Sequence, residues 1–286
     1  MRLTRGCGMV ARPSALRHLG FLAGLALVAL LASAALLAPV LAPYDPLQVA
    51  AGAGATLEGP SLVHPLGTDI LGRDLLSRVL WAGRVSLSVG IGVEMLAALI
   101  GCVLGVLAGY YGGALDAILM RSTDAVMAFP SLVLAIGLIA VFERPGLDKV
   151  VIVLVALGWT TIARVVRGTV LTLKAREFVQ AARALGVGDA AIMVRHLLPN
   201  AVAPILVTAT IGVGSNIVAE AGLSFLGLGA QSPTISWGAM LADGQTFLAT
   251  APWVAVFPGL ALLLAVLGVN LLGDGLRDLL DPRFRE

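Results

Sequence analysis

Residues 85–109 read VSLSVGIGVEMLAALIGCVLGVLAG and contain one charged side chain, Glu94. An apolar stretch of about 20 residues is long enough to cross a bilayer as a helix, which satisfies its own backbone hydrogen bonds. Five further apolar runs occur, at roughly residues 19–42, 117–142, 147–168, 200–221 and 253–273. The sequence therefore predicts an all-α, polytopic membrane protein with six transmembrane helices.

The overall composition supports this fold class. The 286 residues are 58% hydrophobic and 13% charged, with a mean hydropathy of +0.96. Because soluble domains are about 25% charged, a soluble enzyme, a disordered regulator and a secreted disulfide scaffold are all excluded. The net charge of +2 is too small to indicate nucleic-acid binding. We therefore expect the lipid bilayer and other proteins as partners, and no nucleic acid.

The distribution of lysine and arginine predicts the orientation. Fourteen of these 19 residues lie in segments that face the cytoplasm if the N-terminus is inside, and residues 222–252 contain none. Both termini are thus expected to be cytoplasmic. We expect residues 1–18 to form an N-terminal tail and residues 19–286 to form one six-helix domain. The first apolar run exceeds the about 7–15 residues of a signal-peptide core, so we expect an uncleaved span.

The longest predicted cytoplasmic loop covers residues 169–199, and its residues 174–198 read KAREFVQAARALGVGDAAIMVRHLL. Apolar residues at helical spacing predict a first short helix, with Phe178, Ala181, Ala182 and Leu185 on one face. Glycines follow this helix, and Asp189 is a candidate N-cap for a second helix that stops before proline 199. Two interpretations remain open: the loop rests on lipid headgroups, or its small residues let a partner protein approach closely.

Several stretches resemble a known family. The segment EFVQAARALG, followed by RHLLPN, resembles the EAA loop of permease subunits in bacterial ABC importers. Beyond this loop, the chain resembles the second permease subunit of the dipeptide and oligopeptide branch of that family. The stretches that carry this resemblance are HPLGTDILGRDLLSRVL (64–80), GYYGG (109–113), MRSTDAVMAFPSLVLAI (120–136), ARVVRGTVL (163–171), EAGLSFLGLG (220–229), SWGAML (236–241) and NLLGDGLRDLLDPR (270–283). This resemblance implies a type I ABC importer permease fold in the bacterial cytoplasmic (inner) membrane. The implied cargo is a di- or oligopeptide, with nickel or another small solute as the alternative.

The resemblance also implies a site and a set of partners. The loop at about residues 169–199 would couple the permease to a cytoplasmic ATPase through Glu177, Phe178, Gln180, Ala181, Ala182, Arg183, Gly186 and Asp189. The implied partners are a homologous permease subunit forming a heterodimer, two cytoplasmic ATPase subunits and an extracytoplasmic substrate-binding protein. The chain departs from the family pattern at Gln180, where glutamate is usual, so Glu177 one turn earlier is the candidate acidic contact.

No catalytic machinery is expected in this chain. The sequence contains no G-x-x-x-x-G-K-[ST] phosphate-binding loop and no G-x-S-x-G elbow. We therefore expect no enzyme activity, metal or cofactor in this chain, with ATP and Mg on the partner ATPases. A secondary transporter driven by an ion gradient and a membrane-anchored scaffold are the competing functions. The former is expected to have ionisable groups at mid-membrane, and only Glu94 suggests it.

Two carboxylates and a series of glycines stand out within the apolar runs. Glu94 and Glu220 are candidate translocation-path residues, because charges at membrane depth usually face protein or water. Alternatively they are packing residues, paired with Arg84 or Arg121. The second run contains small residues suited to close helix packing, namely Gly90, Gly92, Gly101, Gly105 and Gly109.

Outside the membrane, residues 68–84 are expected to form an amphipathic helix. Thr68 or Asp69 is the candidate cap, and Asp69 with Arg73 forms an i,i+4 pair. The helix is either a scaffold on the outer surface or a docking surface for the binding protein.

Overall fold

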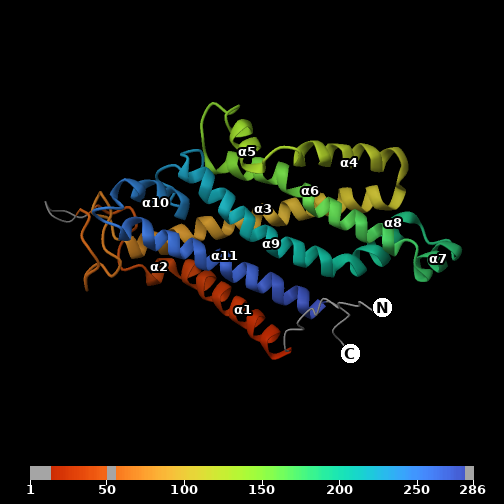
Figure 1. The fold of residues 1–286 in the computed structure, drawn as a ribbon, viewed down its shortest axis with the longest axis horizontal. Coiled ribbons are helices and arrows are strands. Elements are labelled where there is room, and N and C mark those ends of the chain that lie inside the picture. The colour runs from red at the N-terminus through yellow and green to blue at the C-terminus, as the bar shows by residue number, and fades with distance from the viewer. Residues whose placement is uncertain (1–13, 50–55, 281–286) are drawn as a thin grey trace, which may run out of the picture.

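The computed structural model describes residues 14–49 and 56–280, and these residues are almost entirely helical (Figure 1). Among them, the only β-type pairing is an isolated bridge between Thr68 and Asp74. The helices in chain order are α1 (Ser14–Leu36), α2 (Ala38–Leu41), α3 (Leu75–Tyr111), α4 (Gly113–Met127), α5 (Ser131–Ile139), α6 (Leu147–Leu173), α7 (Glu177–Ala184), α8 (Asp189–Ala191), the π-helical turn η1 (Ile192–Leu197), α9 (Leu198–Phe225), α10 (Trp237–Gly244), the 3-10 turn η2 (Gln245–Phe247) and α11 (Trp253–Leu280). Of the predicted N-terminal tail, residues 1–13 lie outside the described residues, and α1 already begins at Ser14.

Five described helices are long and apolar enough to cross a membrane: α1, α3, α6, the continuous helix Asp189–Phe225, and α11. The third apolar run is different, because α4 and α5 meet at an angle of 89° and form a sixth span only as a bent pair. The third span is therefore a bent pair of helices and not one straight helix. Pro130 precedes α5 and has no backbone N–H to continue α4, which explains the break.

Helix α3 is longer than its apolar run. Its 37 residues correspond to about 55 Å, against about 30 Å for the hydrocarbon core. It begins at Leu75, and its cap is Asp74, whose carboxylate accepts the backbone N–H of Ser77 at 2.8 Å. The predicted external helix from residue 68 is therefore wrong: residues 75–84 belong to α3, and residues 68–74 form a turn. The Asp69–Arg73 pair is confirmed at 2.7 Å, but it closes this turn.

Helix α3 packs closely along α6 through glycines spaced four residues apart. A Cβ added to Gly101 would lie 2.6 Å from the carbonyl oxygen of Trp159, and one added to Gly105 would lie 2.6 Å from that of Ala163. Gly109 continues the stripe, with Val170 at 2.9 Å. Small residues allow this approach where no hydrophobic force drives helices together. The predicted packing role is confirmed here and for Gly90 beside α9, but Gly92 has open space around it.

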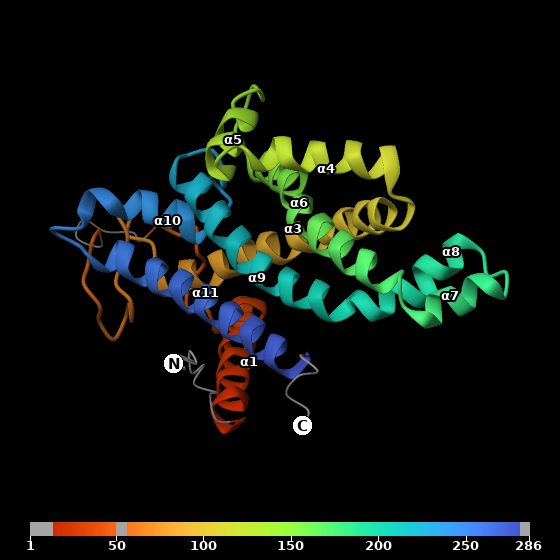
Figure 2. The same ribbon diagram turned by 45° about the vertical axis from the view of Figure 1, so that its right-hand side comes forward.

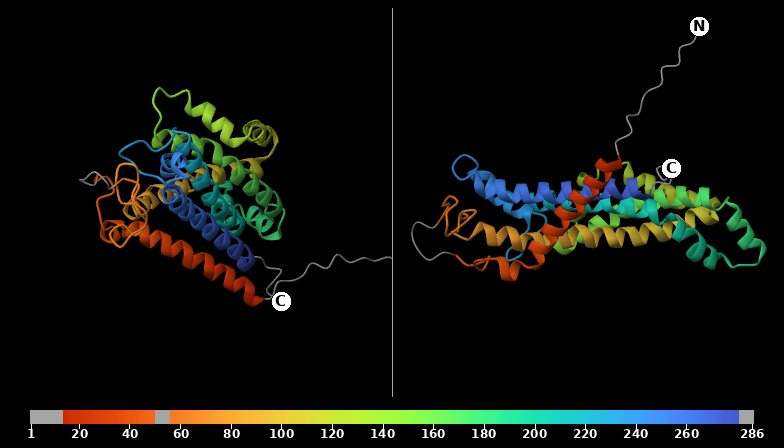
Figure 3. Two further views of the ribbon diagram at one scale, coloured as in Figure 1. Left: turned by 60° about the vertical axis from the view of Figure 1, so that its left-hand side comes forward. Right: turned by 90° about the horizontal axis from the view of Figure 1, so that it is seen from below.

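Helix α1 lies at the periphery of the bundle against α11 (Figure 3). Here too glycine permits the contact: a Cβ on Gly24 would lie 2.5 Å from the backbone nitrogen of Leu272. Most leucines on the other faces of α1 are exposed, including Leu22 and Leu30. This is the pattern expected of a helix whose outer face contacts lipid.

The two ends of the molecule differ in structure. Helices α7 and α8 project from one end, while α10 and the segment that leads into α3 lie at the other (Figures 1 and 2). The first turn of α1 and the last turn of α11 lie near each other (Figures 1 and 3). The candidate sites are therefore distributed along the long axis of the bundle.

Candidate functional site

The helix pair predicted for the loop at residues 169–199 is present as α7 and α8, and we call residues 177–191 the coupling element after the role predicted for them. Helix α7 ends at a left-handed glycine, Gly186, with φ of 77°. The N–H of Val187 donates to the carbonyl of Ala182 at 3.1 Å, and that of Gly186 to Arg183 at 2.9 Å. This is the Schellman pattern, which favours glycine because other residues are strained at positive φ.

The second helix of the coupling element differs from the prediction. Gly188, and not Asp189, occupies the N-cap position, and Asp189 is the first residue of α8. The helix does not stop before Pro199, because η1 joins α8 to α9 in one continuous rod. In this wide turn the N–H of Leu198 donates to the carbonyl of Met193, five residues earlier. This wide turn directly precedes Pro199, whose missing N–H and ring disfavour regular α-helical winding inside a helix.

The faces of α7 are also arranged differently from the expectation. Val179 and Ala182 are buried against a cluster from α3, α6 and η1 that includes Val106, Val166 and Ile192. The apolar residues Phe178, Ala181 and Leu185 lie on the exposed side, together with Glu177, Gln180, Arg183 and Gly186. Ala182 therefore anchors the coupling element to its own protein, contrary to the prediction that it lines the partner-facing surface.

A polar cluster fastens the coupling element to the end of α3. The hydroxyl of Tyr110 donates to Asp189 Oδ1 at 2.5 Å, and the Arg183 guanidinium lies 5.0 Å from the centre of the Tyr110 ring. Lys174 Nζ donates to the carbonyl of Gly109 at 2.7 Å. This role of Tyr110 was not predicted from the sequence. Its position in the GYYGG stretch was the available signal.

Two ion pairs join α4 to the same half of α6. Arg167 holds Asp116 with two nitrogens, and its Nη2 donates to Asp116 Oδ2 at 2.6 Å. Arg164 Nη2 lies 2.7 Å from Asp124 Oδ1. The bent third span is therefore tied to a straight helix that leads directly into α7.

A cavity of about 1020 Å³ lies among the spanning helices α3, α6, α9 and α11 and the bent pair α4–α5. We call it the Glu94 cavity, because Glu94 is the one ionisable residue in its lining. Most of the lining is apolar. The other polar side chains that line it are Ser131, Thr160, Thr161, Thr208, Ser215, Asn216 and Asn270. An apolar pocket with few polar groups is typical of a ligand site.

The structure separates the two membrane carboxylates. Glu220 is fully buried outside the lining of the Glu94 cavity, where Ser86 and Ser224 donate to its two oxygens at 3.0 and 2.7 Å. Glu94 instead accepts a hydrogen bond from Asn216 Nδ2 at 2.8 Å. Within the described ranges neither carboxylate pairs with Arg84 or Arg121, so the ion-pair alternative is wrong.

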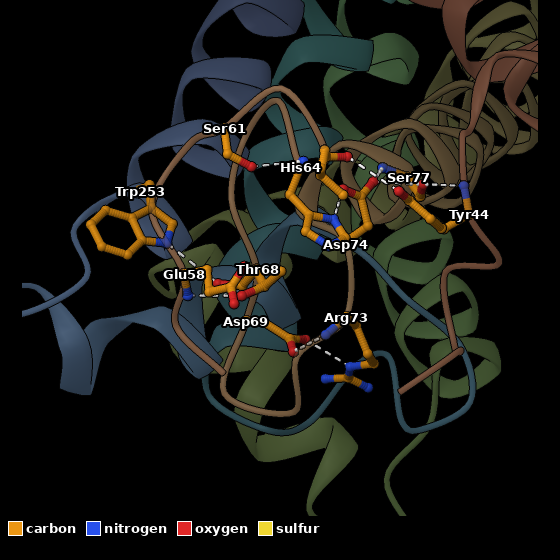
Figure 4. A network of polar contacts seen from close by, with 11 residues as sticks. Tyr44, Glu58, Ser61, His64, Thr68, Asp69, Arg73, Asp74, Ser77 and Trp253 are labelled. Carbon is orange, nitrogen blue, oxygen red and sulfur yellow. Dashed lines mark hydrogen bonds and ion pairs between the residues drawn. The ribbon is translucent and has the colours of Figure 1, made fainter. Parts of the chain in front are cut away.

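At the opposite end, a polar network holds the segment that precedes α3 (Figure 4). Asp74 accepts hydrogen bonds from Ser77, and His64 Nδ1 lies 3.0 Å from its Oδ1. The backbone N–H of Tyr44 donates to Ser77 Oγ at 3.1 Å, and Trp253 Nε1 donates to the carbonyl of Thr68 at 3.3 Å. Hydrogen bonds between residues far apart in the chain thus hold the segment that precedes α3 against the starts of α3 and α11.

Comparison with known proteins agrees with this arrangement. Residues 101–286 match the family described as the binding-protein-dependent transport system inner membrane component. The chain belongs to this family. It is 44% identical to the dipeptide transport system permease protein of Alkalihalophilus pseudofirmus over 80% of this chain and 75% of that protein. It is also 44% identical to the glutathione transport system permease protein of Pectobacterium atrosepticum, over 94% of this chain and 88% of that protein. The chain is therefore a multi-pass membrane permease subunit.

Proposed function

We propose that this permease moves di- or oligopeptides into the cytoplasm as one subunit of an ATP-driven importer. The observation that supports this best is the coupling element, which projects from the bundle and is fastened to α3 and α9 at its base. The names of the relatives support the cargo, since one is a dipeptide permease and the other a permease for glutathione, itself a tripeptide.

The energy for transport comes from other chains. Two cytoplasmic ATPase subunits bind ATP and Mg, a homologous permease subunit completes a heterodimer, and an extracytoplasmic binding protein delivers the peptide. ATP changes the access of the cavity only through its different affinity for two states of this assembly. This chain supplies the moving part and no catalytic group.

The coupling element lies at the cytoplasmic face of the inner membrane in this proposal. The basic residues of the second half of α6 and of the segment through α7 lie toward this end of the bundle, as the positive-inside rule requires; they are Arg164, Arg167, Lys174, Arg176 and Arg183. The start of α1 and the end of α11 lie near each other, in keeping with two termini on one side. Both termini are then cytoplasmic.

The exposed apolar residues Phe178, Ala181 and Leu185 form the docking face of the coupling element. They recur at the i, i+3, i+7 spacing of a helix that seats in a groove. Glu177 is exposed in the first turn and supplies the acidic contact that Gln180 lacks. Val179 and Ala182, on the opposite side, pass the displacement to the cluster shared by α3 and α6.

Cysteine crosslinking tests this proposal. Ala181→Cys places a thiol on the exposed docking face. Ala182→Cys is the matched control, because it places a thiol at the next residue, which is buried. In the complex coexpressed with its neighbouring genes, the first variant should crosslink to an ATPase subunit in an ATP-dependent manner, and the second should not. Equal crosslinking of both variants, or none from Ala181→Cys, would refute the docking face.

A further inference from the structure

The Glu94 cavity holds a carboxylate near the middle of α3. Glu94 is only 6% exposed, and it lies 19 residues after the start of this 37-residue helix. Because a charge at membrane depth is costly, such groups are normally paired or face a functional site. The surroundings of Glu94 therefore decide which of these applies.

Several other carboxylates of the described residues have basic partners. Asp69 pairs with Arg73, and Asp116 pairs with Arg167. In contrast, no lysine, arginine or histidine lines the Glu94 cavity within the described ranges. No basic side chain of the described residues is therefore placed to compensate a negative charge on Glu94.

The hydrogen bonding of Glu94 is also incomplete. Asn216 Nδ2 donates to Glu94 Oε2, whereas Glu94 Oε1 accepts no hydrogen bond from any described residue. Glu220 provides an internal comparison, because serine hydroxyls donate to both of its oxygens. Glu94 therefore has one carboxylate oxygen without a donor among the described residues, whereas both oxygens of Glu220 have one.

Two glycines of α9 make room for the polar side chains of this cavity. A Cβ added to Gly212 would lie 2.5 Å from Glu94 Oε1, and one added to Gly214 would lie 3.3 Å from Asn270 Oδ1. Asn216 follows one turn after Gly212 and Asn270 comes from α11, and both line the cavity. Glycine at position 212 therefore lets the Glu94 carboxylate lie directly against α9, and glycine at position 214 lets the Asn270 amide oxygen approach the same helix.

We propose that Glu94, together with Asn216 and Asn270, forms a subsite for the ammonium group at the amino end of the transported peptide. This inference rests on the proposed function. An ammonium group has three N–H donors and one positive charge, which match one carboxylate and two amide oxygens. Peptides with a free amino terminus share this group whatever their side chains. A largely apolar path thereby recognises peptides without reading their sequence.

A purely structural role for Glu94 makes a different prediction. Glutamine has nearly the same size and can accept the hydrogen bond of Asn216, so Glu94→Gln would then be nearly silent. Under the subsite proposal the same change removes the charge that attracts the ammonium group. Glu94→Asp keeps the charge and serves as the matched variant.

The first test measures the charge preference of the cavity without using transport. Ser215 is exposed, lines the cavity and precedes Asn216, so Ser215→Cys is introduced into the complete transporter after Cys7 and Cys102 are changed to alanine. We compare its reaction rates with cationic and anionic methanethiosulfonate reagents of similar size. Glu94→Gln should lower the cation-to-anion rate ratio about tenfold, and Glu94→Asp should largely keep it. A change below twofold, or no reaction with either reagent, would overturn the proposal.

The second test measures uptake of dialanine by the transporter in vesicles with its binding protein. Glu94→Gln should reduce ATP-dependent uptake about tenfold, while ATP hydrolysis stimulated by the loaded binding protein persists. Uptake by Glu94→Gln equal to that of the unchanged transporter would refute the subsite but leave the importer function intact. If the unchanged transporter shows no ATP-dependent uptake of dialanine, the proposed peptide importer itself fails.

Discussion

Replacing Gly105 with alanine is expected to separate α3 from α6. The added methyl group would lie 2.6 Å from the carbonyl oxygen of Ala163 and 2.8 Å from Val166 Cβ. Ordinary contacts begin at 3.4 Å, so the two helices must move apart by about 0.8 Å at this point. The carbonyl belongs to the backbone of α6 and cannot rotate away as a side chain would.

The expected loss of stability follows from this geometry. Overpacking a tight contact costs about 1–3 kcal/mol, and a rigid backbone neighbour favours the upper end. Alanine recovers about 1 kcal/mol through its higher helix propensity. The net loss is about 2 kcal/mol, and at about 2–4 °C per kcal/mol the apparent melting temperature should fall by about 4–8 °C.

The assay is thermal unfolding of the purified complex in detergent, at one scan rate because such unfolding is commonly irreversible. Gly92→Ala is the matched control, since it lies on the same helix and a Cβ there meets nothing within 4 Å. The control should keep or slightly raise the melting temperature. Equal shifts for the two variants would show that the glycine stripe does not set the spacing of α3 and α6.

Three further outcomes are expected. Gly186→Ala strains the left-handed end of α7 by about 1–2 kcal/mol, so peptide uptake per ATP should fall while the complex still assembles; unchanged stoichiometry in vesicles would contradict this. Tyr110→Phe removes the hydrogen bond to Asp189, worth about 1 kcal/mol, and should speed hydrogen exchange in α7 and α8; unaltered exchange would exclude that fastening role. Asp116→Asn and Arg167→Gln should show a coupling energy of about 1 kcal/mol in a double-mutant cycle on thermal stability, and additive effects would argue against the pair.

The positions of the spans could be predicted from sequence, because each needs an apolar run of a length set by the bilayer. The bend between α4 and α5 could not be predicted in the same way. Pro130 indicates a break in the helix. The angle of 89° between α4 and α5, however, also involves the packing of α4 against α6 through Arg164 and Arg167. These arginines follow α4 by about 40 residues or more in the chain.

The candidate sites were predictable in part. The coupling element was found from its glycines and helical spacing, but its faces were not, since α7 has apolar residues on two sides. Only the tertiary structure shows that Val179 and Ala182 are buried while Phe178 and Leu185 are exposed. Glu94 was identified as an unusual charge, whereas its partner Asn216, 122 residues away, has no local signal in the sequence.

The wide turn η1 has a geometric consequence for the importer. An α-helix advances about 100° per residue, and the wide turn at Ile192–Leu197 takes up one extra residue, so winding the same residues as a regular α-helix would swing α7 about 100° around the axis of α9. Phe178 and Leu185 would then point in a new direction, and Asp189 would leave Tyr110. The direction in which the docking face points is therefore set by one extra residue in the continuous helix that joins α8 to α9.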